Sequence, residues 1–351
     1  MIGGFRGGRG CRCYRLLVTE DSTAALRFGV LGAARIAPAA LIGPARRTPA
    51  VTVSAVAARD RARAQRFARR HGIGRVVGDY HELIADPDLD AVYIPLPNGL
   101  HGRWTRAALA AGKHVLCEKP FTADADEARE IATAAADSGR VVMEAFHYRY
   151  HPLIRAAEEI IASGELGTVT RVEAAMSFPL PKFSDIRYDY GLAGGALMDA
   201  GCYAVHMARV LGGAEPEVVS ATAKPHRDPR VDRAMSAELR FPAGHTGSIR
   251  CSMWSSDVLR MSATVDGDRG RMRLFNPVLP HYGHLLTVRS GGGTRRLRFG
   301  RRPSYDYQLD AFVAAVRGGT PVPTGPDDAV ATMTVIDAVY RAAGLPSRLP
   351  S

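Results

Sequence analysis

The chain of 351 residues falls into two stretches that differ in how apolar and polar positions alternate. From about residue 25 to 147, short apolar runs alternate with longer stretches of helical periodicity. Strands that alternate with helices predict βαβ units with right-handed crossovers, and therefore a doubly wound parallel sheet. We expect strands at Arg27–Leu31, Val51–Ala57, Arg75–Val77, Ala91–Ile94, His114–Cys117 and Arg140–Glu144. Helices are expected at Ile36–Arg46, Arg61–His71, His81–Ala85, His101–Ala111 and Ala123–Ser138.

Beyond residue 147 the apolar residues alternate singly with polar ones, and turn residues separate the runs. This pattern predicts an α+β domain built on a large, open, mostly antiparallel sheet. Its expected strands are Thr168–Ser177, Val218–Ala223, Ala234–Phe241, Thr246–Ser252, Ser262–Asp266, Met272–Phe275 and Leu285–Arg289. A helix is expected at Pro152–Ser163, and helices at Met198–Leu211 and Tyr307–Arg317 are expected to cover one face of the sheet.

Three segments follow from these patterns. Residues 1–24 are rich in Gly and Arg and predict a flexible extension, with no continuous apolar core of a signal peptide. Residues 25–147 form the predicted dinucleotide-binding domain, and residues 148–351 the predicted substrate-binding and oligomerisation domain. A last helix at Asp328–Ala343 belongs to the second domain by position, and the pattern leaves open whether it packs back on the first.

Composition excludes several classes of protein. The chain is 46% hydrophobic and 23% charged, which is ordinary for a soluble globular protein. Its net charge is +11, but its arginines are dispersed or lie along one helix-like stretch at residues 59–70, and no nucleic-acid-binding motif accompanies them. We therefore expect no nucleic-acid partner. No apolar run reaches the roughly 18 residues of a membrane helix, so no membrane partner is expected either.

The five cysteines make neither a zinc-ligand spacing nor a disulfide framework. We expect no metal site and a reduced, cytoplasmic compartment. The cysteines are Cys11, Cys13, Cys117, Cys202 and Cys251.

The first expected strand runs into a glycine turn that opens a helix. Gly32 permits a tight turn, and Ala37 is small enough for the helix to lie close to the strand, while Ala34 replaces the middle glycine of the usual fingerprint. The free N–H groups of such a helix start bind a pyrophosphate. We therefore expect a Rossmann-type cofactor site that includes Gly32, Ala34, Arg35 and Ile36.

The end of the second strand indicates which nucleotide binds. NAD-dependent enzymes place an acidic residue there for the ribose 2′-hydroxyl, whereas NADP-dependent enzymes place an arginine near the 2′-phosphate. Ala58 occupies the acidic position, and Arg59 follows it. This favours NADP(H) over NAD(H), although a shift of one residue would make Asp60 a ribose ligand.

Two further segments carry candidate chemistry. Glu118-Lys119-Pro120 follows the fifth strand, so Lys119 is expected at the carboxyl edge of the sheet, with Pro120 a candidate for a cis peptide bond. In the second segment Asp199, Tyr203 and His206 have the spacing i, i+4 and i+7, which places them on one face of a helix. An apolar core stripe capped by Asp199 would give the same pattern.

Four motifs, in their order along the chain, resemble the glucose–fructose oxidoreductase/inositol dehydrogenase family. They are the glycine turn, the Glu118-Lys119-Pro120 triplet, the Gly-Gly-x-Leu-x-Asp-x-Gly-x-Tyr segment ending at Tyr203, and the closing Asp-Ala-Val-Tyr-Arg-Ala-Ala-Gly. The resemblance covers nearly all of the chain after Arg27. Val-Ala-Ala-Arg-Asp and Met-Glu-Ala look most like the NADP-dependent dihydrodiol/xylose dehydrogenase branch, and Ser184–Tyr188 is similar to sugar 3-ketoreductases. Many members carry His in place of Tyr203.

The resemblance implies an enzyme that moves a hydride between NADP(H) and a CH–OH/C=O carbon of a sugar-like substrate. Lys119 would lie beside the nicotinamide and the reacting oxygen, and Tyr203 would be the acid/base. A nearby ammonium would lower the tyrosine pKa from its usual value of about 10. Asp199 would hold Lys119 or a substrate hydroxyl.

The remaining site residues follow from the same resemblance. The segment after the fourth strand, with Leu96, Asn98 and His101, would line the crevice, as would Glu118. The substrate-contact candidates are Lys119, Arg187, Tyr188, Asp199, Tyr203 and His206. Arg187 would meet a phosphate if the substrate were a nucleotide-linked sugar, and His206 is equally compatible with a core position.

Two other functions remain open from sequence. A non-catalytic NAD(P)-binding regulator would share the fold, and so would a glycoside hydrolase that retains NAD. An NADP-type Arg59 disfavours the hydrolase, and the presence of both Lys119 and Tyr203 disfavours the regulator. We also expect the open sheet to expose a wide apolar face that pairs with a second copy, as a homodimer or homotetramer.

Overall fold

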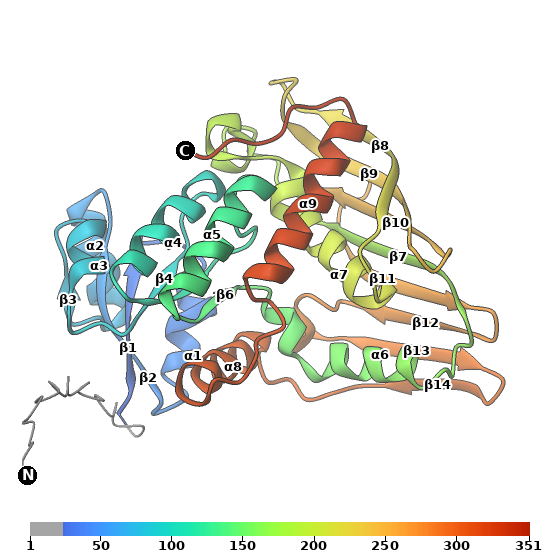
Figure 1. The fold of residues 1–351 in the computed structure, drawn as a ribbon, viewed down its shortest axis with the longest axis horizontal. Coiled ribbons are helices and arrows are strands. Elements are labelled where there is room, and N and C mark those ends of the chain that lie inside the picture. Colours follow the sequence, from blue (N-terminus) through green and yellow to red (C-terminus); the bar gives the residue numbers. More distant parts are fainter. Residues whose placement is uncertain (1–23) are drawn as a thin grey trace, which may run out of the picture.

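The computed structural model describes residues 24–351, so most of the predicted extension, with Cys11 and Cys13, lies outside the described residues. A parallel sheet of six strands in the order β3-β2-β1-β4-β5-β6 forms the left part of Figure 1. This is the predicted doubly wound Rossmann arrangement. Its strands are β1 (Leu26–Leu31), β2 (Val51–Ala57), β3 (Arg75–Val76), β4 (Ala91–Ile94), β5 (His114–Cys117) and β6 (Val142–Glu144).

Three of the helices between these strands begin at aspartate caps. Asp60, Asp79 and Asp124 each accept the amide N–H three residues further on, at 3.1, 2.8 and 2.8 Å. The first predicted helix is shorter than expected, because the chain turns until Pro38 before a π-turn and one short helix follow. The helical segments are η1 (Pro38–Ile42), α1 (Gly43–Ala45), α2 (Arg61–His71), α3 (Tyr80–Ala85), α4 (His101–Ala110) and α5 (Ala125–Ser138).

The second sheet has eight strands in the order β14-β13-β12-β11-β7-β10-β9-β8, and only β7 and β10 pair in parallel. The prediction of a large, mostly antiparallel sheet is therefore confirmed. Its strands are β7 (Val169–Ser177), β8 (Glu217–Pro225), β9 (Asp232–Arg240), β10 (Thr246–Ser252), β11 (Arg260–Gly267), β12 (Gly270–Phe275), β13 (Leu285–Ser290) and β14 (Gly293–Leu297). The edge strand β14 was not predicted, because its residues are largely exposed and show no alternation.

Helix α7 (Cys202–Gly212) covers one face of this sheet, as predicted, and packs on β7 and β10. Helix α8 (Ser304–Gly318) does not, contrary to expectation. It packs on the parallel sheet instead, where the rings of Phe312 and Phe28 lie 5.3 Å apart. The apolar stripe of α8 is therefore buried against the other domain. Helix α6 (Pro152–Ala162) packs on α7.

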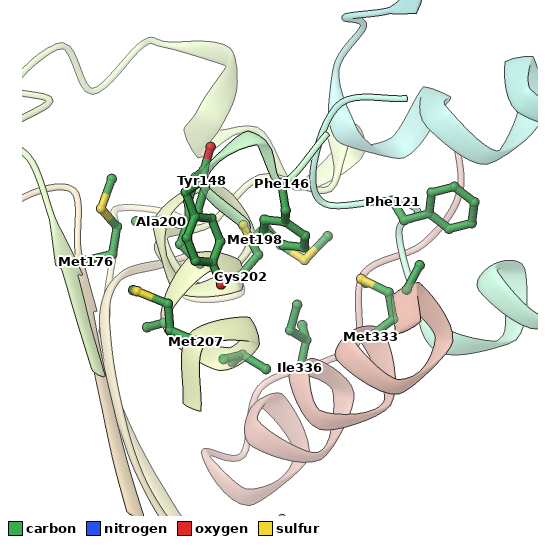
Figure 2. Close-up of a cluster of buried hydrophobic side chains, with 14 of the residues drawn as sticks. Phe121, Phe146, Tyr148, Met176, Met198, Ala200, Cys202, Met207, Met333 and Ile336 are labelled. Atoms are coloured by element: carbon green, nitrogen blue, oxygen red, sulfur yellow. The ribbon is translucent and has the colours of Figure 1, made fainter. Parts of the chain in front are cut away.

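Helix α9 (Pro326–Ala342) packs on α5 of the parallel-sheet domain and on β8 of the second sheet. Figure 2 shows Met333 and Ile336 of α9 in one buried cluster with Met198, which precedes α7, and Met207, which lies in α7. The last helix thus packs back on the first domain while sharing the core of the second.

The outer face of the second sheet differs from the expected wide apolar surface. Among residues 24–351, only Val219 and Phe275 are large, clearly exposed apolar side chains on its strands. Its central outward positions carry Ser236, Glu238 and Arg250. This face is mainly polar and mixed in charge. Within the same range no helix has the length and apolar character needed to cross a membrane, and no cluster of three metal-ligating side chains occurs.

Candidate functional site

The glycine turn after β1 has the geometry of a phosphate cradle. Gly32 has φ +104°, which favours glycine, and a Cβ there would lie 3.2 Å from a methyl group of Leu96. In the described part of the chain, the backbone N–H groups of residues 33–36 donate to no protein acceptor. Four free N–H groups at a turn that leads into a helical segment suit a dinucleotide pyrophosphate. The residues present therefore fit such a cofactor.

The end of β2 presents arginines at the same edge. Arg59 is exposed, and the Arg63 guanidinium donates to the Ala33 carbonyl at 2.8 Å, next to the glycine turn. One oxygen of the Asp60 carboxylate accepts the Arg63 N–H as the cap of α2. This geometry favours the arginine interpretation of the β2 end over Asp60 as a ribose ligand.

The loop after β4 is fixed by its polar side chains. Both ring nitrogens of His101 face carbonyl oxygens, at 2.7 Å from Pro120 and 2.8 Å from Leu96. Burial lowers the pKa of His101 to about 4, even though the two carbonyls favour the charged ring. Asn98 donates to the Ala193 carbonyl of the second domain at 3.1 Å. The loop after β4 is thereby joined to the second domain.

Lys119 lies at the carboxyl edge of the sheet, as predicted, and its peptide bond to Pro120 is cis. Its Nζ donates to the Asp199 carbonyl at 2.8 Å and faces the Asp199 carboxylate at 3.4 Å. Burial lowers the Lys119 pKa, but the neighbouring Asp199, Cys202 and Glu118 together outweigh burial, and the pKa is raised. Lys119 is therefore an ammonium. Beside it, Glu118 is buried and accepts the Tyr93 hydroxyl at 2.7 Å.

Asp199 lies in a π-turn, η6 (Leu197–Gly201), that leads into α7. Its second carboxylate oxygen pairs with Arg187 Nε at 3.0 Å, so one carboxylate serves Lys119 and Arg187 together. Arg187 also pairs with Asp185 at 3.2 Å. Its charge is thus balanced by two acidic side chains.

The Tyr203 ring lies under the Lys119 ammonium, with Nζ 5.1 Å from the ring centroid. Its hydroxyl lies 3.3 Å from His147 Nε2. We expected a lowered pKa for Tyr203, but burial raises it well above its usual value, and nearby Tyr305 and Glu118 raise it further. The ammonium lies over the ring rather than beside the oxygen, so Tyr203 is a neutral phenol.

His147 was missed by sequence reasoning. It lies in η3 (His147–Tyr150), three residues after the end of β6, at the same carboxyl edge that identified Lys119. The rule that finds ligand-binding residues at this edge would have found it.

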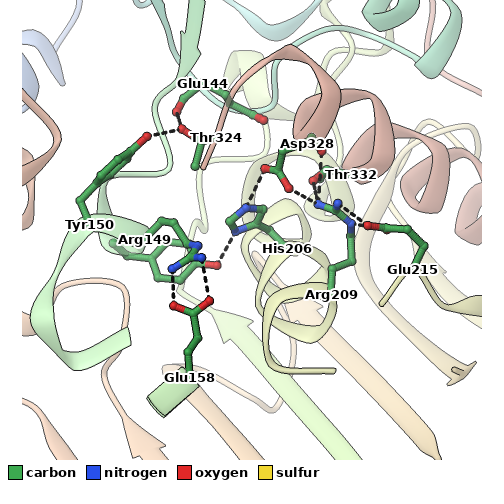
Figure 3. A network of polar contacts seen from close by, with 11 residues as sticks. Glu144, Arg149, Tyr150, Glu158, His206, Arg209, Glu215, Thr324, Asp328 and Thr332 are labelled. Atoms are coloured by element: carbon green, nitrogen blue, oxygen red, sulfur yellow. Dashed lines mark hydrogen bonds and ion pairs between the residues drawn. The ribbon is translucent and has the colours of Figure 1, made fainter. Parts of the chain in front are cut away.

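His206 is placed in the core. Its ring is fully buried and stacked on Phe146, with Nδ1 2.5 Å from the Tyr148 hydroxyl and Nε2 2.9 Å from Asp328 (Figure 3). Both nitrogens are occupied by protein groups, so His206 has no polar atom left for a substrate. The core alternative that the sequence left open describes this position.

Two other candidates lie at the edge of the site. The Tyr188 hydroxyl donates to the Leu180 carbonyl at 3.0 Å, and its ring is buried and stacked on His226. Arg35 is 85% exposed and lies 3.9 Å from Asp185, which connects the glycine turn to the Arg187 cluster. The structure therefore brings Lys119, Asp199, Tyr203 and Arg187 together, whereas Tyr188 supports the loop.

Two family models match consecutive parts of the chain. Residues 26–146 match a model described as oxidoreductase family, NAD-binding Rossmann fold. Residues 154–273 match a model described as GFO/IDH/MocA C-terminal domain. Together the two matches span most of the chain and agree with the resemblance seen in the sequence.

Similar proteins are enzymes by name. A D-xylose 1-dehydrogenase (NADP(+)) from Haloferax volcanii is 42% identical over 91% of this chain and 97% of its own length. A trans-1,2-dihydrobenzene-1,2-diol dehydrogenase from Bos taurus is 37% identical over 64% of this chain and 66% of its own. A 3-ketoreductase from Actinomadura kijaniata, solved with NADP and TDP-benzene, superposes with TM-score 0.84 at 30% identity, over 91% of this chain and 98% of that one.

Proposed function

Because this chain belongs to the glucose–fructose oxidoreductase/inositol dehydrogenase family, we propose that it transfers a hydride between NADP(H) and a CH–OH/C=O carbon of a sugar or sugar-like substrate. The observation that carries the proposal is the cluster of Lys119, Asp199 and Tyr203 at the carboxyl edge of the parallel sheet. This edge is where ligands bind in doubly wound sheets, and the phosphate cradle at Gly32 lies along it.

Bound NADP(H) supplies or accepts the hydride, and the protein handles the oxygen and its proton. In reduction, the Lys119 ammonium polarises the carbonyl oxygen, and Tyr203 gives that oxygen its hydroxyl proton. In oxidation, the Tyr203 oxygen takes the proton back. Asp199 keeps Lys119 charged and in place.

NADP(H) is the proposed cofactor because arginines rather than a free carboxylate stand at the end of β2. Arg59 is exposed there, and Asp60 is used as a helix cap. A guanidinium matches a phosphate dianion in charge and hydrogen-bond geometry. The Haloferax volcanii enzyme carries NADP(+) in its name, which agrees with this choice.

A free sugar is the better substrate candidate than a nucleotide-linked one. Ion pairs with Asp199 and Asp185 offset part of the Arg187 charge, so this arginine attracts a phosphate less strongly than an unpaired one. Similarity to a xylose dehydrogenase over most of the chain supports the same choice.

The testing experiment is a fluorescence titration of nucleotide-free protein with NADPH and NADH, on wild type and Arg59→Ala. Tighter NADPH binding that is lost in Arg59→Ala supports the proposal, and a screen of aldoses and ketoses with NADP⁺ and NADPH then follows. Equal or tighter NADH binding contradicts the cofactor assignment. NADPH binding without turnover of any sugar favours the regulator, and nucleotide that cannot be removed favours the hydrolase.

The same proposal includes a homodimer formed through the outer face of the eight-stranded sheet. On that face Arg171 pairs with Glu173 at 2.9 Å and with Glu238 at 3.5 Å, so both signs of charge lie side by side. In a dimer with two-fold symmetry the same surface of each protomer meets its own copy. A surface that carries both signs of charge can then place its basic groups opposite the acidic groups of the other protomer. Sedimentation equilibrium tests this, since a monomer in both low and high salt contradicts it.

A further inference from the structure

The Tyr203 hydroxyl is the end of a buried chain of hydrogen-bonding groups. His147 Nε2 lies 3.3 Å from Tyr203 Oη, and His147 Nδ1 lies 2.8 Å from the Ser304 hydroxyl. The three residues come from α7, η3 and α8. His147 is 2% exposed and Ser304 fully buried, and the His147 ring packs on Tyr305 with centroids 3.9 Å apart. The ring therefore has little freedom to turn.

The hydrogens in this chain can be assigned from its buried groups. Within residues 24–351, the Ser304 hydroxyl has His147 as its one hydrogen-bond partner. If His147 Nδ1 carried the proton, the Ser304 hydrogen would be buried without an acceptor, which is unfavourable. Ser304 therefore donates to Nδ1, and the neutral ring carries its proton on Nε2. That N–H points to Tyr203.

We propose that His147, fixed by Ser304, is a positioning residue that donates its Nε2–H to the Tyr203 oxygen and so directs the tyrosine's own proton to the substrate. The role rests on the proposed function. In reduction, the hydride goes to the carbonyl carbon and the Tyr203 proton goes to the carbonyl oxygen, which leaves an alcohol and a phenolate. The His147 N–H remains in place and stabilises the phenolate, and no proton passes to the imidazole.

The surroundings keep the ring neutral. Burial, with smaller contributions from His281 and Lys119, lowers the pKa of His147 to about 3. Further titratable groups near His147 and Tyr203 are Glu118, Tyr148, Asp199, Cys202 and Tyr305. A neutral ring that donates one N–H can support a phenolate without competing for its proton.

The test compares His147→Phe, which keeps an aromatic ring against Tyr305 but has no donor, with His147→Gln, which retains an N–H donor. For the sugar found in the screen, kcat and KM for oxidation are measured from pH 6 to 10. Without the donor the phenolate is harder to form, so the rising limb of the pH profile in His147→Phe shifts up by about one unit and kcat near pH 7 falls about tenfold. KM and NADPH affinity stay near wild type.

His147→Gln is expected to restore most of this loss, and Ser304→Ala to give a smaller upward shift, since it removes the group that fixes the tautomer. An active wild type with the same pH profile in His147→Phe overturns the role of His147 alone. Equal losses in the Phe and Gln variants, with lower thermal stability, show a packing role and also overturn it. A wild type that binds NADPH but reduces and oxidises no sugar overturns this role together with the proposed function.

Discussion

Two tyrosine–histidine pairs lie side by side in this protein, and they differ in what the second histidine nitrogen contacts. η3 supplies His147 and Tyr148, and α7 supplies Tyr203 and His206. Each histidine of one element meets the tyrosine of the other, at 3.3 Å for His147–Tyr203 and 2.5 Å for Tyr148–His206. The same two residue types therefore build both pairs.

The surroundings of the two pairs differ, and this difference indicates which pair is catalytic and which is structural. The second nitrogen of His206 contacts Asp328, which also pairs with Arg209 at 2.9 Å (Figure 3). The Tyr148–His206 pair is therefore part of a network of charged side chains that we call the closed network. Tyr203 has the Lys119 ammonium over its ring and a hydroxyl with hydrogen-bonding capacity left. Unused capacity beside a charged group, rather than residue type, marks the candidate catalytic pair.

The same substitution in both pairs is the strongest test of this difference. Tyr203→Phe removes the proposed acid and is expected to lower kcat about 10²–10⁴-fold. It also leaves His147 Nε2 buried without its partner, so the free energy of unfolding falls by about 1–3 kcal/mol. Tyr148→Phe leaves His206 Nδ1 buried without its partner, so the free energy of unfolding falls by about 1–3 kcal/mol while kcat is largely kept. Steady-state kinetics and urea unfolding measure both. A comparable loss of kcat in the two variants would contradict the division.

Asp328→Ala tests the closed network. It leaves Arg209, which is 6% exposed, without its partly buried partner and His206 without its acceptor. Loss of one partner of a buried pair typically costs about 3–5 kcal/mol, so a comparable fall in unfolding free energy is expected. Glu215→Ala is the matched control. Glu215 is 57% exposed, and its loss is expected to cost less than about 1 kcal/mol. Equal effects of the two changes would show that Asp328 is not the centre of the network.

A third histidine, His114, also has a hydrogen-bonded ring nitrogen, and its effect on stability should depend on pH. His114 Nδ1 accepts the Val141 N–H at 2.9 Å, so the folded state needs a neutral ring. Burial, with help from Arg140, lowers the pKa of His114 to about 4, whereas the unfolded value is near 6.5.

Between these values the unfolded chain binds a proton that the folded chain does not, so the contribution of His114 is complete above about pH 6.5 and is lost as pH falls towards 4. The loss is up to about 3 kcal/mol at this site. Urea unfolding at pH 7, 5.5 and 4.5 should show a smaller decline for His114→Asn, which keeps an acceptor but does not titrate. Parallel declines in the two proteins would remove His114 as a source of acid sensitivity.

The alternation of apolar and polar residues was enough to predict the two sheets, but not all of their partners. Strands β1, β4 and β5 are buried along nearly their whole length and stood out as apolar runs. The stripe on α8 also predicted a helix, yet an apolar stripe does not specify which sheet it meets. Contact between Phe312 and Phe28, far apart in sequence, decides that question.

The site shows the same limit at the scale of side chains. Motifs identified Lys119, Asp199 and Tyr203, which the structure brings together. The spacing of His206 suggested a substrate contact, but its two nitrogens contact Tyr148 and Asp328, which come from other elements. His147 comes from a different element, and only the folded chain brings it to Tyr203.

The smallest expected effect concerns Asp60, which the sequence left open as a ligand of the cofactor ribose. Its carboxylate accepts the Arg63 N–H at 3.1 Å as the cap of α2, so Asp60→Ala is expected to lower the free energy of unfolding by about 1 kcal/mol. Affinities for NADPH and NADH should both remain within about twofold, since a cap supports the helix and makes no ribose contact. Asp60→Ser, which retains a capping oxygen, should recover the stability. If Asp60→Ala instead abolished NADH binding while the free energy of unfolding stayed unchanged, the Asp60 carboxylate would be a ribose ligand. A hydrogen bond within the protein would then not exclude a role in binding at this position.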